Sequence, residues 1–243
     1  MPPLSPALTE LWHLLFDLAE HLQGWCLIGG QMVALHGLEC GRTDIRPTTD
    51  GDVLVDIRAD PAALRRVVRF VTDLGFEMDP GPEGQGHRYK RQADVGAIVV
   101  DILAPDNLGP RATLTTTPPG RTIEVPGGTQ ALRHVAFVPV IVAGRTGSIP
   151  RPDLLAAILA KEAATHLPFK EVHLQDLAFL LSLVPNPASA ELTNAERAKL
   201  RASELSNRGH PVWKTLSTVH ANAGHAALGL LSRLPRSGVI TDR

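Results

Sequence analysis

The chain has 243 residues, of which 44% are hydrophobic and 20% charged, a composition typical of a folded protein with one large domain or two small ones. Its formal net charge of −1 excludes a global basic field, so any binding of nucleic acid must depend on local patches. Two cysteines exclude a disulfide framework, and the lack of a leader-like start or a long apolar run predicts a cytoplasmic protein with no membrane partner.

The first half of the chain alternates between helical and strand patterns. Leucines recur at helical spacing after Ser5 and Pro6, which are typical of a helix start, and Gly24 follows that helix. In chain order we then expect a strand over 25–28, a helix over 31–36 closed by Gly37, a strand over 50–57, a helix over 60–74, and strands over 87–91 and 97–103.

Residues 105–150 are rich in Pro, Gly and Thr, with short strand-like stretches over 122–125 and 135–142. From Pro152 onward helices are predicted over 154–166, 172–183, 196–205 and 211–231, the third with a capping box formed by Thr193 and Glu196. The sequence therefore predicts an α/β (α+β) fold: a small mixed sheet with flanking helices over 1–148, then a helical C-terminal domain over 149–243.

Two aspartates open the strand expected over 50–57. Residues two apart in a strand project from the same face, so Asp50 and Asp52 should point together. Two like charges at that distance repel each other unless a cation lies between them. Mg²⁺ (or Mn²⁺) suits such a pair because it prefers oxygen ligands and keeps positions open for phosphate oxygens.

A third aspartate, Asp101, interrupts the apolar run AIVVDIL over 97–103. An unpaired carboxylate in such a strand would be costly to bury. A neighbouring strand that carries Asp50 and Asp52 supplies the explanation, since three carboxylates would then converge on metal. Asp101 could also accept the proton of an attacking hydroxyl. The competing interpretation of the Asp50 and Asp52 pair is a surface turn without catalytic function.

Gly29 and Gly30 lie between the strand over 25–28 and the helix that follows it. Glycines at such a turn let backbone N–H groups approach a phosphate, and the start of a helix favours an anion. The spacing matches neither the P-loop nor the dinucleotide fingerprint. The pair therefore indicates a phosphate-binding turn only through its position ahead of the aspartates, and a plain strand-to-helix turn is the alternative.

The segments LIGGQMVALHG (27–37), TDGDVLVD (49–56) and VVDIL (99–103) resemble the nucleotidyltransferase superfamily with the polymerase-β-like minimal fold. In that family a Gly-Gly or Gly-Ser turn precedes a strand with two Asp, and a later strand carries a third. The helical half resembles the AbiEii and MenT toxin-type members, on LAAILAK (155–161) and KEVHLQDL (170–177). The resemblance covers roughly residues 25–184.

The resemblance implies a reaction and a set of roles. A nucleoside triphosphate, such as ATP, would donate its nucleoside monophosphate to a hydroxyl and release pyrophosphate, with Asp50, Asp52 and Asp101 as metal ligands. Lys161 would contact the triphosphate, and Asp176 would orient Lys161 or the nucleotide; a surface salt-bridge cluster of Lys170, His173 and Asp176 is the equal alternative. Toxin-type members further imply RNA, such as tRNA ends, as acceptor, and a cognate antitoxin as partner.

The sequence alone leaves two other functions open. One is a small-molecule nucleotidyltransferase of the antibiotic-modifying kind, and the other is a non-catalytic nucleotide-binding protein that retains the fold. The sequence departs from the family at Gly30, where many members have Ser, and at Gly51, where an apolar residue is usual. It also has extra residues around 39–46, whose Arg42 and Arg46 we interpret as solvated loop residues rather than triphosphate contacts.

The densest basic segment is HRYKR over 87–91, which directly precedes the strand of Asp101. It could line the acceptor side, where its arginines would contact RNA phosphates and Tyr89 would stack a base. We favour the other interpretation, in which charged side chains protect an exposed strand edge.

Overall fold

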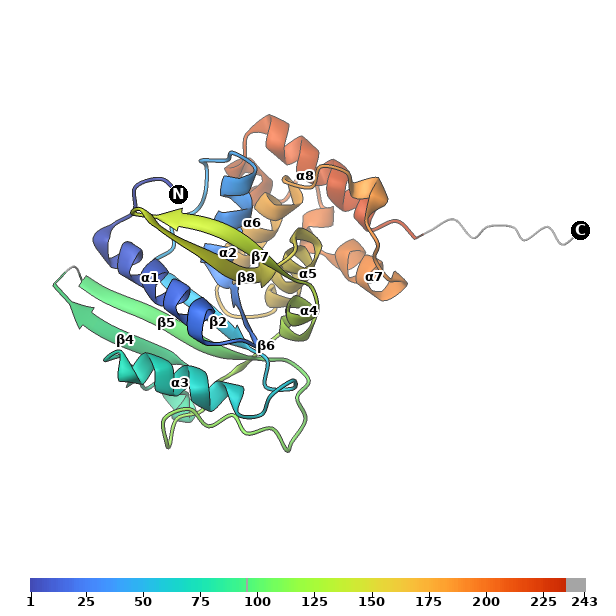
Figure 1. The fold of residues 1–243 in the computed structure, drawn as a ribbon. Helices are drawn as coiled ribbons and strands as arrows, with labels where there is room; N and C mark the ends of the chain where they lie inside the picture. The colour runs from blue at the N-terminus through green and yellow to red at the C-terminus, as the bar shows by residue number, and fades with distance from the viewer. Residues whose placement is uncertain (95, 235–243) are drawn as a thin grey trace, which may run out of the picture.

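A mixed β-sheet with helices on both faces forms the centre of the molecule (Figure 1). The computed structural model describes residues 1–94 and 96–234. The strands of the sheet are β1 (Trp25–Ile28), β2 (Asp50–Val55), β3 (Glu77–Asp79), β4 (Arg88–Ala93), β5 (Gly96–Pro105) and β6 (Glu124–Val125). Their order is β1-β2-β5-β4-β3, with β6 beside the end of β5. The parallel pairs are β2 with β5 and β5 with β6. The expected α+β fold class is confirmed.

One face of the sheet is apolar and is covered by two helices, α1 (Pro6–His21) and α3 (Ala63–Asp73). The helix α1 begins where the sequence predicted, because the Ser5 side chain accepts a hydrogen bond from the backbone N–H of Leu8 and Pro6 occupies the first turn. Alternate residues of β5, such as Val100 and Ile102, are fully buried beneath these helices. The main core therefore lies on this face.

The other face carries α2 (Gly29–Glu39) and α4 (Gly128–Arg133). The predicted end of α2 at Gly37 is wrong, since the helix continues to Glu39. A Cβ atom at Gly37 would lie 2.7 Å from Cζ of Phe179, so this glycine provides room for an aromatic ring from a C-terminal helix. The glycine is a packing residue and not a helix stop.

A long β-hairpin follows α4 and is formed by β7 (Val135–Val142) and β8 (Arg145–Pro152). The sequence predicted β7 but missed β8, because Gly147, Pro150 and Pro152 are poor strand residues. The hairpin reaches α1 and β1 through β8. The domain boundary expected near residue 148 thus lies inside a strand that packs against the N-terminal half.

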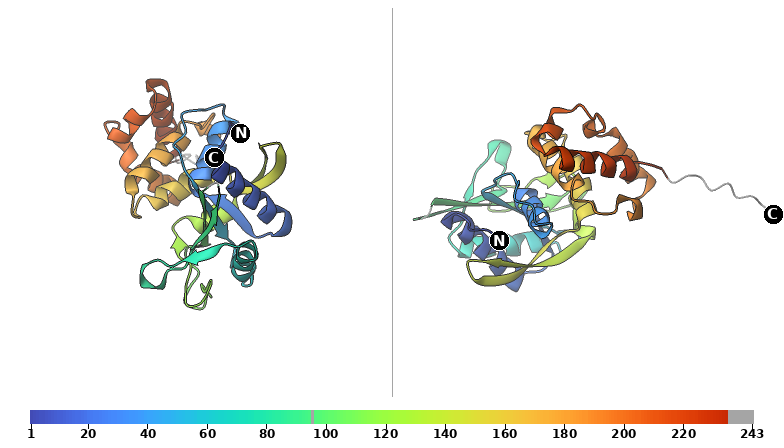
Figure 2. Two further views of the ribbon diagram at one scale, coloured as in Figure 1. Left: turned by 90° about the vertical axis from the view of Figure 1, so that its left-hand side faces the viewer. Right: turned by 90° about the horizontal axis from the view of Figure 1, so that it is seen from above.

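The helices α5 (Leu154–Ala164), α6 (Lys170–Leu181), α7 (Asn194–Ala202) and α8 (Thr218–Leu231) gather beyond α2 and α4 (Figure 2). The predicted capping box of α7 is present, with Thr193 and Glu196 bonded to each other's backbone N–H groups. The single helix expected over 211–231 is wrong, because Ser217 caps a new helix after a 3₁₀ turn over Pro211–Thr215.

The end of the expected C-terminal domain, residues 235–243, lies outside the described residues. Within the ranges that are described, no helix is both long and apolar enough to cross a membrane.

Candidate active site

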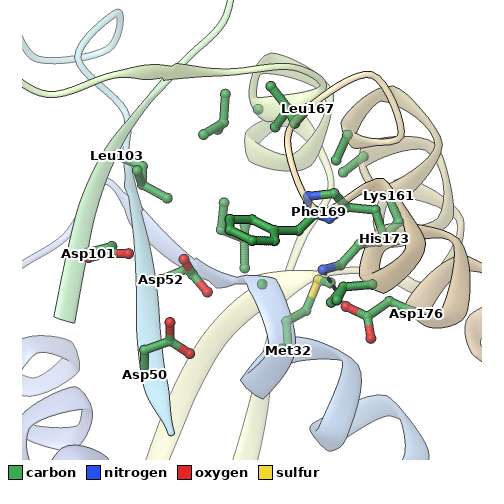
Figure 3. Close-up of a pocket in the computed structure, with 18 of the residues that line it drawn as sticks. Met32, Asp50, Asp52, Asp101, Leu103, Lys161, Leu167, Phe169, His173 and Asp176 are labelled. Atoms are coloured by element: carbon green, nitrogen blue, oxygen red, sulfur yellow. Dashed lines mark hydrogen bonds and ion pairs between the residues drawn. The ribbon is translucent and has the colours of Figure 1, made fainter. Parts of the chain in front are cut away.

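Three carboxylates share the face of the sheet opposite the main core. Alternation along β2 places Asp50 and Asp52 on the same side of the strand. In the parallel register between β2 and β5, Asp52 stands beside Asp101. Figure 3 shows the three side chains at one end of a pocket. The structure therefore brings together the three aspartates that the sequence singled out.

Gly51, between the two aspartates, faces the opposite side of the sheet. A Cβ atom added there would lie 3.0 Å from Cδ1 of Leu11 in α1, which is tighter than an ordinary contact. The glycine thus lets α1 lie close against β2. This departure from the family pattern is explained by packing of the core, and it does not affect the face that carries the carboxylates.

The glycine turn is in direct contact with β2. Gly29 has φ +68°, and a Cβ atom at this position would lie 1.7 Å from Oδ2 of Asp52. A Cβ atom at Gly30 would lie 2.7 Å from Oγ1 of Thr48. Both positions therefore require glycine for steric reasons, and Gly29 requires it also for its backbone conformation. The first turn of α2 begins against the Asp52 carboxylate.

The start of α2 has no side-chain cap, because its N-cap residue is Ile28. The first N–H groups of a helix lack partners within the helix and favour negatively charged ligands. Next to this turn, the Thr48 hydroxyl donates a hydrogen bond of 2.9 Å to Oδ1 of Asp50. The Gln31 side-chain amide donates to the carbonyl of Thr48, at 3.1 Å, and so ties the turn to the start of β2.

The carboxylate of Asp52 is buried beside two like charges. Burial raises the pKa of Asp52 to about 7, and the negative charges of Asp50 and Asp101 add to this effect, while Lys161 and Arg88 oppose it. In the part of the chain that the structure describes, the Asp52 carboxylate accepts no hydrogen bond. A cation at this point would remove the repulsion that raises the pKa.

Arg88 on β4 is the counter-charge of Asp101. Its Nε donates to Oδ1 of Asp101 at 2.8 Å and its Nη2 to Oδ2 at 2.6 Å, and Nη2 also lies 3.7 Å from Oδ2 of Asp50. The hydrogen bonds to Asp101 raise the pKa of Arg88. No local sequence pattern indicates this role, which follows from the pairing of β4 with β5 that places Arg88 opposite Asp101.

Two other residues of the basic segment, Tyr89 and Lys90, make contacts outside the site. Tyr89 is fully buried, and its hydroxyl lies 2.9 Å from Oγ1 of Thr117, so it is not free to stack a base. Lys90 pairs with Asp79 at 2.5 Å. The favoured interpretation of an exposed strand edge is wrong, because β4 lies between β5 and β3.

The donor set of the three aspartates fits a divalent metal. All three side chains offer only oxygen atoms, which suits Mg²⁺ or Mn²⁺, and the Asp52 carboxylate is buried beside two like charges. Among the described residues, no three His, Cys, Asp or Glu side chains are yet placed to hold a metal ion together. Arg88 occupies both oxygens of Asp101, and its side chain is 39% exposed. Access of a metal to Asp101 therefore requires Arg88 to turn outward.

Lys161 and Asp176 form a buried ion pair on the helical side of the pocket. Nζ of Lys161 on α5 donates to Oδ2 of Asp176 on α6 at 2.8 Å, and the side chains are 8% and 2% exposed. Arg46 also binds Asp176, through Nε at 3.1 Å and Nη2 at 3.2 Å. Asp176 thus contacts Lys161, as the interpretation in which it orients this lysine expects. Lys170 does not join Asp176 in a surface cluster, because it pairs with Glu204.

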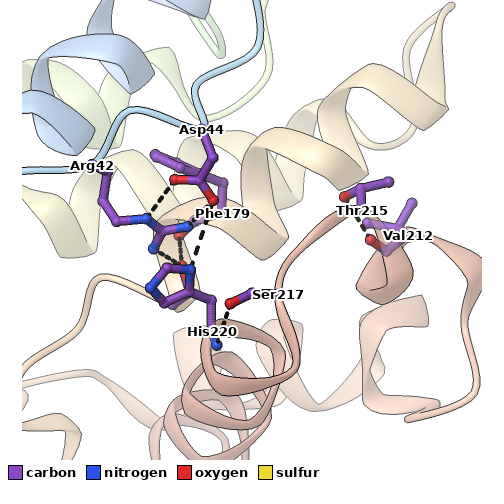
Figure 4. Close-up of polar contacts among 8 residues, drawn as sticks. Arg42, Asp44, Phe179, Val212, Thr215, Ser217 and His220 are labelled. Carbon is purple, nitrogen blue, oxygen red and sulfur yellow. Dashed lines mark hydrogen bonds and ion pairs between the residues drawn. The ribbon is translucent and has the colours of Figure 1, made fainter.

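The loop before β2 is held in place by Arg42 (Figure 4). Its guanidinium donates two hydrogen bonds of 2.6 Å to Asp44 and one of 3.0 Å to Oγ of Ser182. It also lies 4.8 Å from the centre of the Phe179 ring, and His220 of α8 lies 3.7 Å from Asp44. The interpretation of Arg42 and Arg46 as solvated loop residues is wrong, because both make specific contacts with α6.

The pocket between the sheet and α5–α6 has a volume of about 460 Å³. Its polar lining includes the three aspartates, Gly29, Gly30 and Lys161. Such a volume lies within the range of roughly 300–1,000 Å³ that is typical of small-molecule sites. His173 also lines it, and burial lowers the pKa of this histidine, with the charge of Lys161 adding to the effect. All residues predicted for the site, Asp176 included, therefore border one cavity.

No family model matches the chain, and no curated protein matches it. Among solved structures, the chain is similar to an antigenic nucleotidyltransferase-like protein from Paracoccidioides brasiliensis, with 14% identity and a TM-score of 0.48. The alignment covers 99% of this chain and 100% of that chain. The chain is thus similar, at low identity, to a nucleotidyltransferase-like protein.

Proposed function

We propose that the protein is a metal-dependent nucleotidyltransferase, which transfers a nucleoside monophosphate from a nucleoside triphosphate to a hydroxyl acceptor. The observation that carries the proposal is the surroundings of Asp52. This carboxylate has Asp50 two residues away and Asp101 beside it, no donor among the described residues, and the start of α2 against it. A site with excess negative charge beside unpaired helix N–H groups suits a cation together with a phosphate group.

Each part of the site has a role in this reaction. Asp50, Asp52 and Asp101 would hold Mg²⁺ or Mn²⁺, which when bound neutralises phosphate charge and lowers the barrier to in-line displacement. The backbone N–H groups at Gly29 and Gly30 would bind phosphate oxygens. Lys161, held by Asp176, would place its positive charge at the triphosphate.

The bond changes of the transfer are simple. The acceptor oxygen forms a bond to the α-phosphorus, the bond from that phosphorus to the bridging oxygen breaks, and pyrophosphate leaves. The proton of the acceptor hydroxyl passes to a base, and Asp101 is the candidate once Arg88 releases it. Its two hydrogen bonds to Arg88 hold the Asp101 carboxylate in a fixed orientation until substrates enter.

The proposed acceptor is RNA, such as the end of a tRNA, in a cytoplasmic toxin–antitoxin setting with a cognate antitoxin as partner. Arg46 and Arg88 border the pocket, and their guanidinium groups can contact a phosphate backbone. ATP is one candidate nucleotide donor.

One observation favours a second function, a non-catalytic nucleotide-binding protein. Arg88 already binds both oxygens of Asp101, so a guanidinium can replace a metal ion as the balancing charge. In that case a nucleotide would still bind at α2 and Lys161, but no transfer would follow. The small-molecule nucleotidyltransferase considered from the sequence has no comparable observation in its favour.

The test is transfer of label from each of four α-³²P-labelled nucleoside triphosphates to total RNA, with Mg²⁺ or Mn²⁺. We expect labelled RNA with the wild-type protein and a loss of at least about 10³-fold with Asp52→Asn, because a metal ligand is removed without a change in size. Asp94→Asn is the matched control, since Asp94 is an exposed residue of the β4–β5 turn. Binding of nucleotide without any labelled product would support the non-catalytic function instead.

A further inference from the structure

Phe169 is an exposed aromatic residue at the entrance of the pocket. Phe169 is 84% exposed and lines the pocket. It directly precedes α6, with backbone angles φ 59° and ψ 33°. The left-handed backbone region is unfavourable for a residue with a bulky side chain, and such conformations collect at functional sites. An aromatic ring that contributes nothing to the core, on a backbone that is costly to form, indicates a role in binding.

The ring extends into the pocket. Figure 3 shows Phe169 reaching from the connection between α5 and α6 toward the strands, with Leu103 and Asp52 on its far side and Lys161 beside it. The other strongly exposed phenylalanine, Phe137, lies on β7 and does not border this pocket. The position of Phe169 is therefore specific to the site and is not a general property of the surface.

The pocket beside Phe169 is apolar. The side chains of this part of the lining carry no hydrogen-bonding group, and they are Leu103, Ile123, Val125, Ala131, Ala164 and Leu167. A phosphate group would not be stable against such a lining, whereas a flat aromatic group would be. The pocket thus has a charged part for phosphates and an apolar part for a different portion of the ligand.

We propose that Phe169 stacks on the nucleobase of the bound nucleoside triphosphate and holds it against this apolar lining. The inference deepens the proposed function, on which it rests, by assigning a base-binding residue. Stacking uses the π-face that every base has, and the six apolar side chains offer no hydrogen bond to the edge of a base. The site therefore accepts all four bases, with purines bound more tightly than pyrimidines because they stack over a larger area.

The experiment compares the binding of inorganic tripolyphosphate with that of α,β-methylene analogues of ATP, GTP, CTP and UTP, in the presence of Mg²⁺. Calorimetry is carried out on the wild-type protein, Phe169→Ala, Phe169→Trp and the control Phe137→Ala. We expect Phe169→Ala to weaken binding of the four analogues by roughly 10- to 100-fold while binding of tripolyphosphate is unchanged. Phe169→Trp should retain tight binding, and Phe137→Ala should behave like the wild type.

The outcomes separate this inference from the proposed function. Equal affinity of the wild type and Phe169→Ala for the nucleotide analogues would overturn the stacking and leave the phosphate and metal site intact. Tight binding of only one of the four analogues would overturn the inference that the site does not select among bases. A wild-type protein that binds neither tripolyphosphate nor any analogue would overturn both the stacking and the proposed function. Circular dichroism of each variant shows whether it is folded.

Discussion

The two sides of the pocket differ in how the charges of their side chains are paired. The strand side carries Asp50, Asp52 and Asp101, and the pKa of Asp52 is raised to about 7 because burial and like charges oppose its ionisation. The helix side carries Lys161 and Arg46, which share the single carboxylate of Asp176 and together with it keep one net positive charge. On the helix side both cations bind a carboxylate of the protein, whereas on the strand side, among the described residues, Asp101 alone has a bidentate cationic partner.

This difference shows which part of the site depends on a ligand. The ion pairs around Asp176 form during folding and fix the positions of two cations before any substrate arrives. The carboxylates of the strands are held close together by the sheet register, and their repulsion is a cost that a bound cation would remove. The helix side is therefore expected to contribute to stability, and the strand side is expected to reduce it until metal binds.

The largest effect on stability is expected for Asp176→Ala. This change leaves the buried charge of Lys161 without a partner, and such a loss costs about 3–5 kcal/mol. Urea denaturation measures the free energy of unfolding. The control is the exposed pair between Lys170, on the same helix as Asp176, and Glu204, for which Lys170→Ala should cost less than about 1 kcal/mol. The double variant Lys161→Met/Asp176→Leu should recover most of the loss; no recovery would show that the ion pair itself is not the cause.

Asp52→Asn should have the opposite effect and should stabilise the metal-free protein. Because the pKa of Asp52 is raised in the folded state, the folded protein retains a proton that the unfolded chain releases, so the wild type loses stability as pH rises from about 4 to 7. The variant lacks this loss and should be more stable by at most about 4 kcal/mol above pH 7, with the difference vanishing near pH 4. Thermal unfolding from pH 4 to 8 tests this, and a constant difference across that range contradicts it.

A smaller effect is expected for Arg88→Gln. Removing the guanidinium frees both oxygens of Asp101 and adds one net negative charge to the strand side. We expect Mn²⁺ to bind about 10-fold more tightly, which is about 1.4 kcal/mol. Electron paramagnetic resonance of free Mn²⁺ measures the affinity, and Arg91→Gln on the same strand is the control. Weaker binding than in the wild type would mean that Arg88 supports the metal site rather than competing with it.

The smallest effect is expected for Arg42→Lys. Lysine keeps the charge but loses the two parallel hydrogen bonds to Asp44 and the contact with the Phe179 ring. We expect a loss of about 1 kcal/mol in the free energy of unfolding. Activity should fall only slightly, because Arg46 retains its bonds to Asp176. A loss of activity as large as that of Asp52→Asn would show that the loop controls the strand side directly.

The strand side could be predicted because local patterns define it. Period-two alternation places Asp50 and Asp52 on one face of their strand. Asp101 stands out because a lone carboxylate is costly to bury in an apolar strand, so a site that uses it is expected. The glycine turn was recognised by its position before the aspartates. Its steric cause, the contact of Gly29 with Asp52, is a tertiary feature that no local pattern contains.

The rest depended on which elements become neighbours. Arg88 looked like part of a basic run, and only the pairing of β4 with β5 places it opposite Asp101. Arg42 and Arg46 lie in an irregular segment, and each also contacts a residue more than 100 positions away in sequence, Ser182 for Arg42 and Asp176 for Arg46. Phe169 occupies a short connection between helices, where no local pattern predicts whether a single aromatic side chain is buried or exposed.

The packing of α1 against β8 has a consequence for the order in which the protein is assembled during synthesis. Asp17 accepts a 2.6 Å hydrogen bond from Arg145, which is 128 residues later in the chain, and Gly147 lies where a Cβ atom would meet the ring of Phe16. At roughly 5–20 residues per second, the ribosome needs on the order of 10 s to supply the second partner. Until then the side of α1 that packs against β8 has no partner in the nascent chain.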